Sequence, residues 1–171
     1  MNGQFKSGSE QGANVLDQSA RQQWMALLSK AVPTVLEEQV AALGDLPKYQ
    51  FLRSPEIGLA MVRGRAEGSG QPFNLGEMTI TRCVIQLGNQ DGLAEHEKPL
   101  AGFGYVAGRS QRHAELAAVC DALLQDARWH DRVHTQVLGP LKDLAQRRRE
   151  QNAAEVEATR VNFFTMRRGE S

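Results

Sequence analysis

Apolar side chains recur with a helical period near the start of the chain. The i, i+3, i+4, i+7 spacing that marks one face of a helix is met by Trp24, Leu27, Leu28 and Ala31. This helix is predicted to begin at Ser19 and a second at Thr34, because Gln or Glu follows each after three residues, as in a capping box. Gly44 is predicted to end the second helix. Residues 1–17, rich in Gly, Ser, Gln and Asn, are predicted to form a disordered tail.

The middle of the chain changes to the patterns of extended strands. β-Branched and alternating apolar residues predict four strands, at 49–53, 57–65, 77–87 and 100–107. Ser54-Pro55 separates the first two strands, and a glycine-rich loop over 66–76 follows the second. The third strand is apolar on both faces, which predicts a central strand covered on both sides. Gly102 and Gly104 in the fourth are predicted to let another element approach closely.

Beyond Gly108 the helical period returns in three segments of different character. The first is predicted to be a core-facing helix, with an apolar stripe made of Leu116, Val119, Cys120, Leu123, Leu124 and Ala127. A short helical segment over 130–138 is predicted to end at Gly139-Pro140. The third segment, 141–160, is helical but so polar after its first turns that burial in its own domain cannot hold it in place.

The aromatic residues are densest almost at the end of the chain, in 161-VNFFTM-166. We expect Phe163, Phe164 and Met166 to contact a partner, because two adjacent phenylalanines at a terminus must be buried against another surface. The patterns together predict one α+β domain over 18–140, a mostly antiparallel sheet of about four strands covered by helices from both ends of the sequence. Residues 141–171 are predicted to form an extended C-terminal arm, with a helix and a strand-like end, for partner contact.

Composition narrows the classes of function. The chain has 171 residues, and 20 basic and 20 acidic side chains cancel, so no overall field attracts nucleic acid or an anionic membrane. The run Arg147-Arg148-Arg149 raises a nucleic-acid-binding module as an alternative. Glutamates follow that run and no aromatic platform is interleaved, which favours a solvated or partner-facing helix. No secretory signal and no apolar stretch of about 20 residues is present, so we expect a cytoplasmic protein without membrane contact.

The join 108-GRSQRH-113 carries the strongest candidate chemistry. A glycine that ends a strand and opens a helix leaves backbone N–H groups aimed at one point, where the helix dipole favours an anion. The anion-binding candidates are Arg109, Ser110, Arg112, His113 and, from strand 77–87, Arg82. The structural alternative is that Ser110 caps the helix, the arginines are solvated and His113 is hydrogen-bonded. Spacing alone favours that alternative.

Metal and thiol chemistry have weaker signals. His130 and His134 are four residues apart, and Asp126 one turn earlier would complete three ligands on one helix face. The segment lacks the glutamate base of a zinc protease motif, and a solvated polar face is the favoured interpretation, so no metal or other cofactor is predicted for this chain. Cys83 and Cys120 lie within a strand and mid-helix, where cysteines usually act as small core residues.

Several segments in combination resemble one family. They are 76-GEMTITRCVIQL-87, 104-GYVAGRSQRHAELAAVCDALLQD-126 and 161-VNFFTMRRGES-171, together with the early helix 21-RQQWMALLSKA-31. They are similar to the G subunit of the bacterial carbon–phosphorus lyase core complex, which degrades organophosphonates. The resemblance covers the chain from about residue 21 to residue 170, and the N-terminal tail and the loop 88–99 match poorly.

The resemblance implies a subunit rather than an independent enzyme. That family works in an assembly with the H, I and J subunits. With the H, I and L proteins it is required for a transfer from ATP, in which a phosphonate displaces adenine to give a ribose 1-phosphonate 5-triphosphate. The J subunit, an iron–sulfur radical enzyme, later breaks the carbon–phosphorus bond, and catalysis of the first step is placed on the I subunit. The implied substrate raises the anion interpretation of 108–113 to equal weight with the structural one.

Three functions therefore stand as alternatives at this point. The favoured one is a non-catalytic or site-completing subunit of a phosphonate-processing complex. The second is a stand-alone metal-assisted phosphohydrolase that uses His113, His130 and His134. The third is a nucleic-acid-binding module that rests on the arginine run at 147–149.

Overall fold

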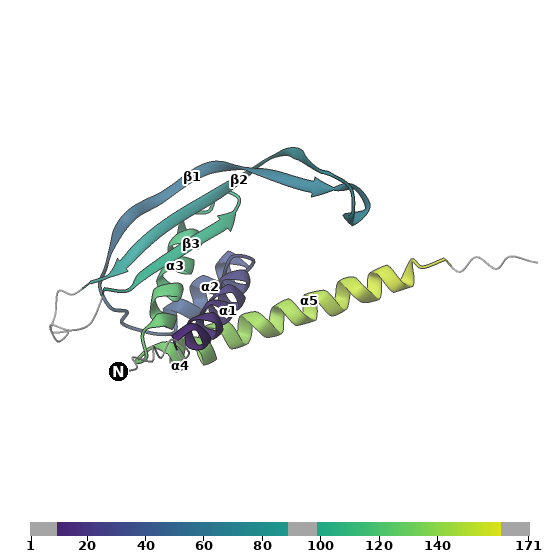
Figure 1. Ribbon diagram of the computed structural model, residues 1–171. Coiled ribbons are helices and arrows are strands. Elements are labelled where there is room, and N and C mark those ends of the chain that lie inside the picture. The colour runs from purple at the N-terminus through teal and green to yellow at the C-terminus, as the bar shows by residue number, and fades with distance from the viewer. Residues whose placement is uncertain (1–9, 89–98, 162–171) are drawn as a thin grey trace, which may run out of the picture.

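A computed structural model describes residues 10–88 and 99–161 of the protein. A sheet arches over a group of helices, and one long helix extends away from that group (Figure 1). The elements are, in order, α1 (Glu10–Leu28), α2 (Pro33–Ala41), β1 (Tyr49–Arg65), β2 (Pro72–Leu87), β3 (Ala101–Ala107), α3 (Gln111–Gln125), α4 (His130–Val133) and α5 (Gly139–Ala158). A 3-10 turn over Ala66–Gly68 joins β1 to β2, and a π-helical turn over His134–Leu138 joins α4 to α5.

The fold is α+β, as predicted, but its sheet has three antiparallel strands in the order β1-β2-β3, not four. The two strands predicted on either side of Ser54-Pro55 are one continuous strand, β1. The β1–β2 register shifts between Phe51 and Arg53 and again between Arg53 and Glu56. These irregularities absorb the proline, which lacks a backbone N–H and is tolerated because β1 lies at the edge of the sheet.

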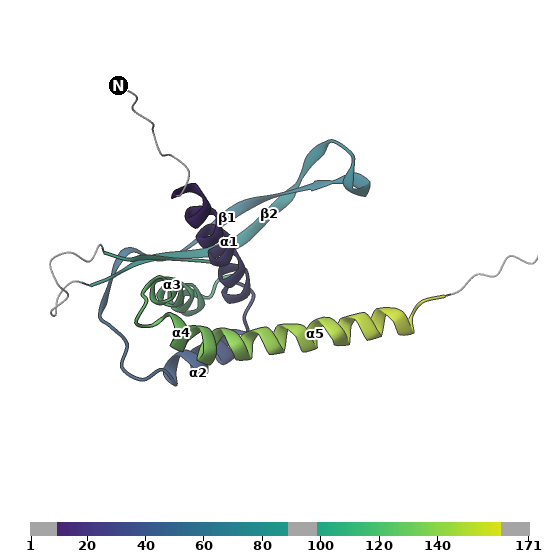
Figure 2. The same ribbon diagram turned by 60° about the horizontal axis from the view of Figure 1, so that its bottom comes forward.

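Helices cover only one face of the sheet, which we call the inner face. Strand β2 is central, as predicted, and its inner-face residues Thr81, Cys83, Ile85 and Leu87 are buried. The residues between them are half-buried, and no described element lies over that opposite, outer face (Figure 2). The prediction that β2 is covered on both sides is therefore wrong for the described part of the chain.

Two glycines of β3 determine how closely α3 packs on the sheet. A Cβ atom on Gly102 would overlap the carbonyl oxygen of Ala118, and one on Gly104 would overlap that of Ala114. Ala114, Ala118 and Ala122 repeat every four residues, so α3 presents a row of small side chains to the glycines. The close approach predicted from the two glycines is confirmed, and the approaching element is the backbone of α3.

The edge of the sheet at β3 is closed by side chains of α3. Asp121, fully buried, accepts hydrogen bonds from the backbone N–H of Phe103 (3.0 Å) and from the indole N–H of Trp24 (2.9 Å). Gln125 donates to the carbonyl of Ala101 at 3.0 Å. Arg21 of α1 pairs with the same Asp121 carboxylate at 2.6 Å. One buried carboxylate thus ties α1 and β3 to α3, and these bonds occupy backbone groups that an open edge would expose.

We expect Asp121→Ala to lower the free energy of unfolding by about 3 kcal/mol, because the indole and amide donors lose their acceptor and Arg21 loses its counter-charge. Urea unfolding followed by circular dichroism measures the change. Asp143→Ala on the exposed side of α5 is the control and is expected to be neutral. Equal stability of the two variants would contradict this role for Asp121.

Several helix boundaries differ from the predictions. Helix α1 begins at Glu10, not Ser19, so residues 10–17 belong to a helix and not to a tail. Helix α2 begins at Pro33 and its N-cap residue makes no side-chain cap, so the capping box predicted at Thr34 does not form. Pro140 lies in the first turn of α5, where its missing N–H costs no helical hydrogen bond; the predicted stop is a start. Gly44 has the positive φ of 75° expected after a helix end.

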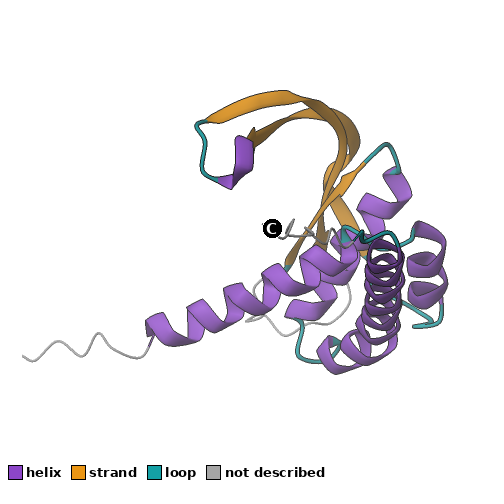
Figure 3. Cartoon of the chain, turned by 90° about the vertical axis from the view of Figure 1, so that its right-hand side faces the viewer, coloured by secondary structure: helices purple, strands orange, loops and turns teal. Residues whose placement is uncertain are grey.

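Two parts of the chain project from the body of the domain. The β1–β2 hairpin continues past the helices, and we call residues 57–79 the hairpin arm; residues 71–78 are all exposed. Helix α5 is anchored by buried Leu141, whereas every residue from 146 to 158 is exposed. Figure 1 shows both projections leaving the same side of the domain, and Figure 3, seen from that side, shows the strands curving over the helices. None of the helices in the described ranges has the length and hydrophobicity that a bilayer span requires.

Candidate functional site

The join at 108–113 is built as a capped helix start. The hydroxyl of Ser110 accepts a hydrogen bond from the backbone N–H of His113 at 3.3 Å, which is the N-cap arrangement. The Nε2 atom of buried His113 lies 2.8 Å from the carbonyl oxygen of Leu28, to which it donates. Both residues thus make the contacts that the structural alternative requires, and His113 joins α3 to the end of α1.

The candidate arginines do not converge on one point. Arg112 pairs with Glu37 of α2 and Glu115 of α3, at 3.1 Å each, beneath the inner face. Arg82 pairs with Glu56 of β1 across the outer face, and its guanidinium holds the pKa of that carboxyl below its usual value. Arg109 is exposed and makes no hydrogen bond or ion pair with another described residue. Of the five candidates, Arg109 is the one whose side chain has no partner among the described residues.

Glu115 belongs to a second small network under the sheet. The Tyr49 hydroxyl donates to Glu115 at 2.6 Å. Partial burial, reinforced by this bond and by the nearby carboxylate charge, raises the pKa of Tyr49 to about 12. Tyr49 therefore stays protonated at neutral pH. The network links the start of β1 to α3 and, through Arg112, to α2.

The histidines do not assemble a metal site with a carboxylate. The His130 and His134 rings stack with centroids 6.0 Å apart, but Nδ1 of His130 is 2.7 Å from the carbonyl of Leu124. The Asp126 carboxylate is bonded to the backbone and guanidinium of Arg128, which lowers its pKa. Within residues 10–88 and 99–161 no group of three or more His, Cys, Asp or Glu side chains is placed to hold a metal ion.

The two cysteines are core residues, as predicted. Both are fully buried, and neither is in a disulfide. Burial raises the pKa of Cys83 to about 11 and that of Cys120 to about 12, with a further contribution from Glu115 and Asp121 respectively. Because the thiolate is the nucleophile, both groups are inert at neutral pH.

The hairpin arm exposes a row of apolar side chains that the sequence patterns did not predict. The β1–β2 register places Ile57, Leu59 and Met61 on the inner face, opposite Thr81, Thr79 and Glu77. Their exposed fractions are 49%, 64% and 49%, because the helices end before the arm does. Phe73 and Leu75 near the tip are also exposed, at 48% and 62%. Exposed apolar residues grouped in this way mark a surface for contact with another molecule.

Helix α5 has the polar character that the sequence predicted, and beyond its first turns, from residue 146 to 158, it is not packed on the domain. Beyond Leu144, which is 42% exposed, the one large apolar side chain of α5 is Val156, 70% exposed. The predicted contact residues Phe163, Phe164 and Met166 lie outside the described residues.

The fold and these surfaces define a class: an α+β protein with two projecting arms, whose described polar clusters hold its own elements together. The family follows from comparison with known proteins. The chain belongs to the family described as phosphonate metabolism protein PhnG, whose model matches residues 19–169. A relative from Rhizobium meliloti (strain 1021), α-D-ribose 1-methylphosphonate 5-triphosphate synthase subunit PhnG, is 40% identical over 153 residues, covering 88% of this chain and 90% of the relative.

Proposed function

We propose that this chain is a subunit of a complex that transfers the ribose triphosphate group of ATP to a phosphonate and releases adenine. Its family and the name of its relative support a role in phosphonate metabolism. The observation that carries the subunit role is the inner face of the hairpin arm, where Ile57, Leu59 and Met61 stand uncovered. An interface of an obligate complex resembles a core cut in half, which is how this surface is built.

The proposed role is to complete a site, not to perform the chemistry alone. The buried polar groups of the described residues are paired with one another, and both thiols are protonated at neutral pH. We therefore place the reacting groups on the partners, which the resemblance names as the H, I and J subunits and the L protein, with the I subunit catalytic in this step. ATP enters as the substrate of the complex, and we propose no cofactor bound by this chain.

Arg109 is the one candidate through which this chain could touch the anionic substrate. We expect Arg109→Ala to lower adenine release by about tenfold, as loss of one charge-assisted bond does, while assembly is unchanged. Comparison of kcat and KM on the purified complex measures the effect. Arg147→Ala, an exposed arginine on α5, is the control. Unchanged turnover, or failed assembly, would show that Arg109 does not act on substrate.

The proposed function is tested by reconstitution. The chain is co-expressed with candidate H and I subunits from the same source, L protein is added, and adenine release from ATP is measured with and without methylphosphonate. We expect release only when this chain and the phosphonate are both present. Phosphonate-dependent release without this chain would overturn the proposal, as would metal-dependent phosphate-ester hydrolysis by the purified chain alone.

A further inference from the structure

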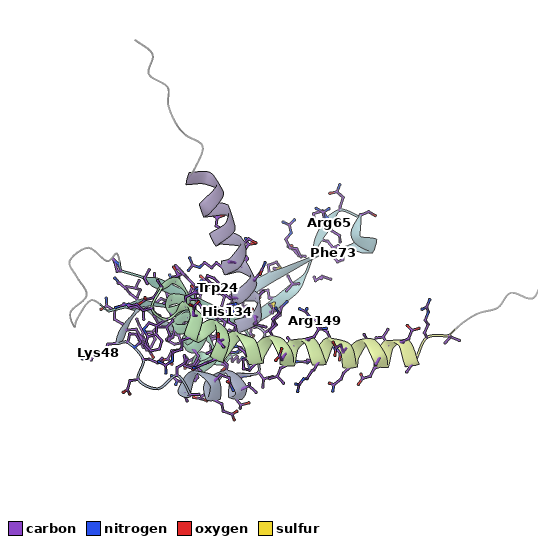
Figure 4. All side chains as sticks on the ribbon, turned by 90° about the horizontal axis from the view of Figure 1, so that it is seen from below. Trp24, Lys48, Arg65, Phe73, His134 and Arg149 are labelled. Carbon is purple, nitrogen blue, oxygen red and sulfur yellow. The ribbon has the colours of Figure 1, made fainter. Side chains whose placement is uncertain are left out.

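A groove of about 740 Å³ lies between α1 and the first half of α5. Its apolar lining comes from Trp24, Leu27, Ala31, Leu138, Leu141, Leu144 and Ala145. Trp24 and His134 lie close together near the start of α5, and Arg149 lies further along that helix (Figure 4). The Trp24 and His130 rings meet edge to face, and His130 stacks on His134, so this part of the groove lining is aromatic.

The charged side chains that line the groove are all basic. They are Lys30, two residues after the end of α1, and Lys142, Arg148 and Arg149 from α5, and no Asp or Glu is among its described lining residues. None of the four makes an ion pair with another described residue. The acidic residues of this part of α5, Asp143 and Glu150, lie outside the lining. Since the whole chain has no net charge, this is a local separation of charge on one surface.

We propose that this groove binds an amphipathic segment of another subunit, one that carries Asp or Glu beside its apolar residues. An apolar floor between two helices accepts the apolar face of such a segment, and the four cations match its carboxylates. Residues 162–171 of the chain itself fit less well, because they contain Arg167 and Arg168. A second copy of this chain also fits less well, because the four cations of its groove would face the four cations of this groove. The inference rests on the proposed function in that the partner is a subunit of the same complex.

Charge reversal tests the proposal on the co-expressed complex. Arg148→Glu combined with Arg149→Glu places two carboxylates against those of the partner, and we expect co-purification to fall by about tenfold or more. Arg147→Glu is the matched control, because Arg147 is exposed in the same arginine run but does not line the groove. Circular dichroism of the free chains should be the same for all variants, because neither arginine of the pair makes an ion pair in the fold.

The occupant is identified by a photoreactive amino acid at position 144, where the side chain lines the groove and is 42% exposed. A cross-link to an acidic, apolar segment of another subunit supports the proposal. A cross-link to residues 162–171, or to a second copy of this chain, overturns it. The proposal is also overturned if the double variant assembles fully but, unlike the wild type, does not bind inorganic triphosphate. The groove would then be a small-anion site. If the wild-type chain fails to assemble, the proposed function fails. If the wild type and the double variant both assemble normally, the groove inference alone fails.

Discussion

Gly104→Ala is expected to prevent the domain from folding, or to lower its free energy of unfolding by at least about 4 kcal/mol. The added methyl group would occupy the position of the Ala114 carbonyl oxygen, and the neighbouring backbone atoms of α3 are also too close. Helix backbone cannot rotate aside as a flexible side chain can, so α3 must separate from β3. Separation opens the centre of the core and displaces Asp121 from the edge of the sheet.

Thermal and urea unfolding of the purified variants measure this effect, with soluble yield as the first readout. Gly58→Ala is the matched control, because Gly58 lies in β1, has an ordinary strand conformation and would place its Cβ in open space. We expect the Gly58 variant to be as stable as the wild type or slightly more stable. A Gly104→Ala protein with wild-type stability would mean that α3 and β3 are not in contact as described.

Leu59→Glu combined with Met61→Glu is expected to abolish assembly with the partner subunits while leaving the fold intact. Both side chains are exposed on the inner face of the hairpin arm, so charge there costs the free domain little. In an interface, the same two carboxylates would be buried without partners, which costs several kcal/mol and is enough to disrupt a specific complex. The free variant should also aggregate less than the wild type.

Size-exclusion chromatography of the co-expressed proteins separates the outcomes of this prediction. Met78→Glu is the control, since Met78 lies on the same arm but on the outer face, opposite Ala60, and is 40% exposed. The control should assemble normally. Normal assembly of the double variant would show that the inner face is not an interface, whereas loss of assembly in all variants would point to the arm as a whole.

The sequence predicted the helices and strands better than it predicted which faces of them are packed against other parts of the chain. Helical and strand periods located α3, β3 and the polar α5, and two glycines spaced by one residue predicted the close packing that α3 provides. The division at Ser54-Pro55 was wrong because a proline at an edge strand is compatible with pairing once the register shifts. The apolar character of both β2 faces was real, but period alone does not say whether the chain itself covers a face.

The candidate site was predicted less well, for a related reason. Ser110 was an anion-binding candidate with a helix cap as its structural alternative, and spacing could suggest the cap because that contact is local, three residues away. Arg82 pairs with Glu56 across a strand pair, and Arg112 pairs with Glu37 of another helix in addition to its neighbour Glu115. Spacing along the chain does not reveal the two distant pairs. The buried hub at Asp121 joins residues about 100 positions apart, so no local motif marks it.

In the proposed complex, a partner subunit covers the inner face of the hairpin arm. Hydroxyl-radical footprinting of the free chain and of the assembled complex tests it directly, because Met61 and Met78 are both exposed and lie on opposite faces of the same arm. We predict that oxidation of Met61 falls strongly on assembly and that oxidation of Met78 does not. Equal oxidation of Met61 in the free and assembled protein would contradict the claim.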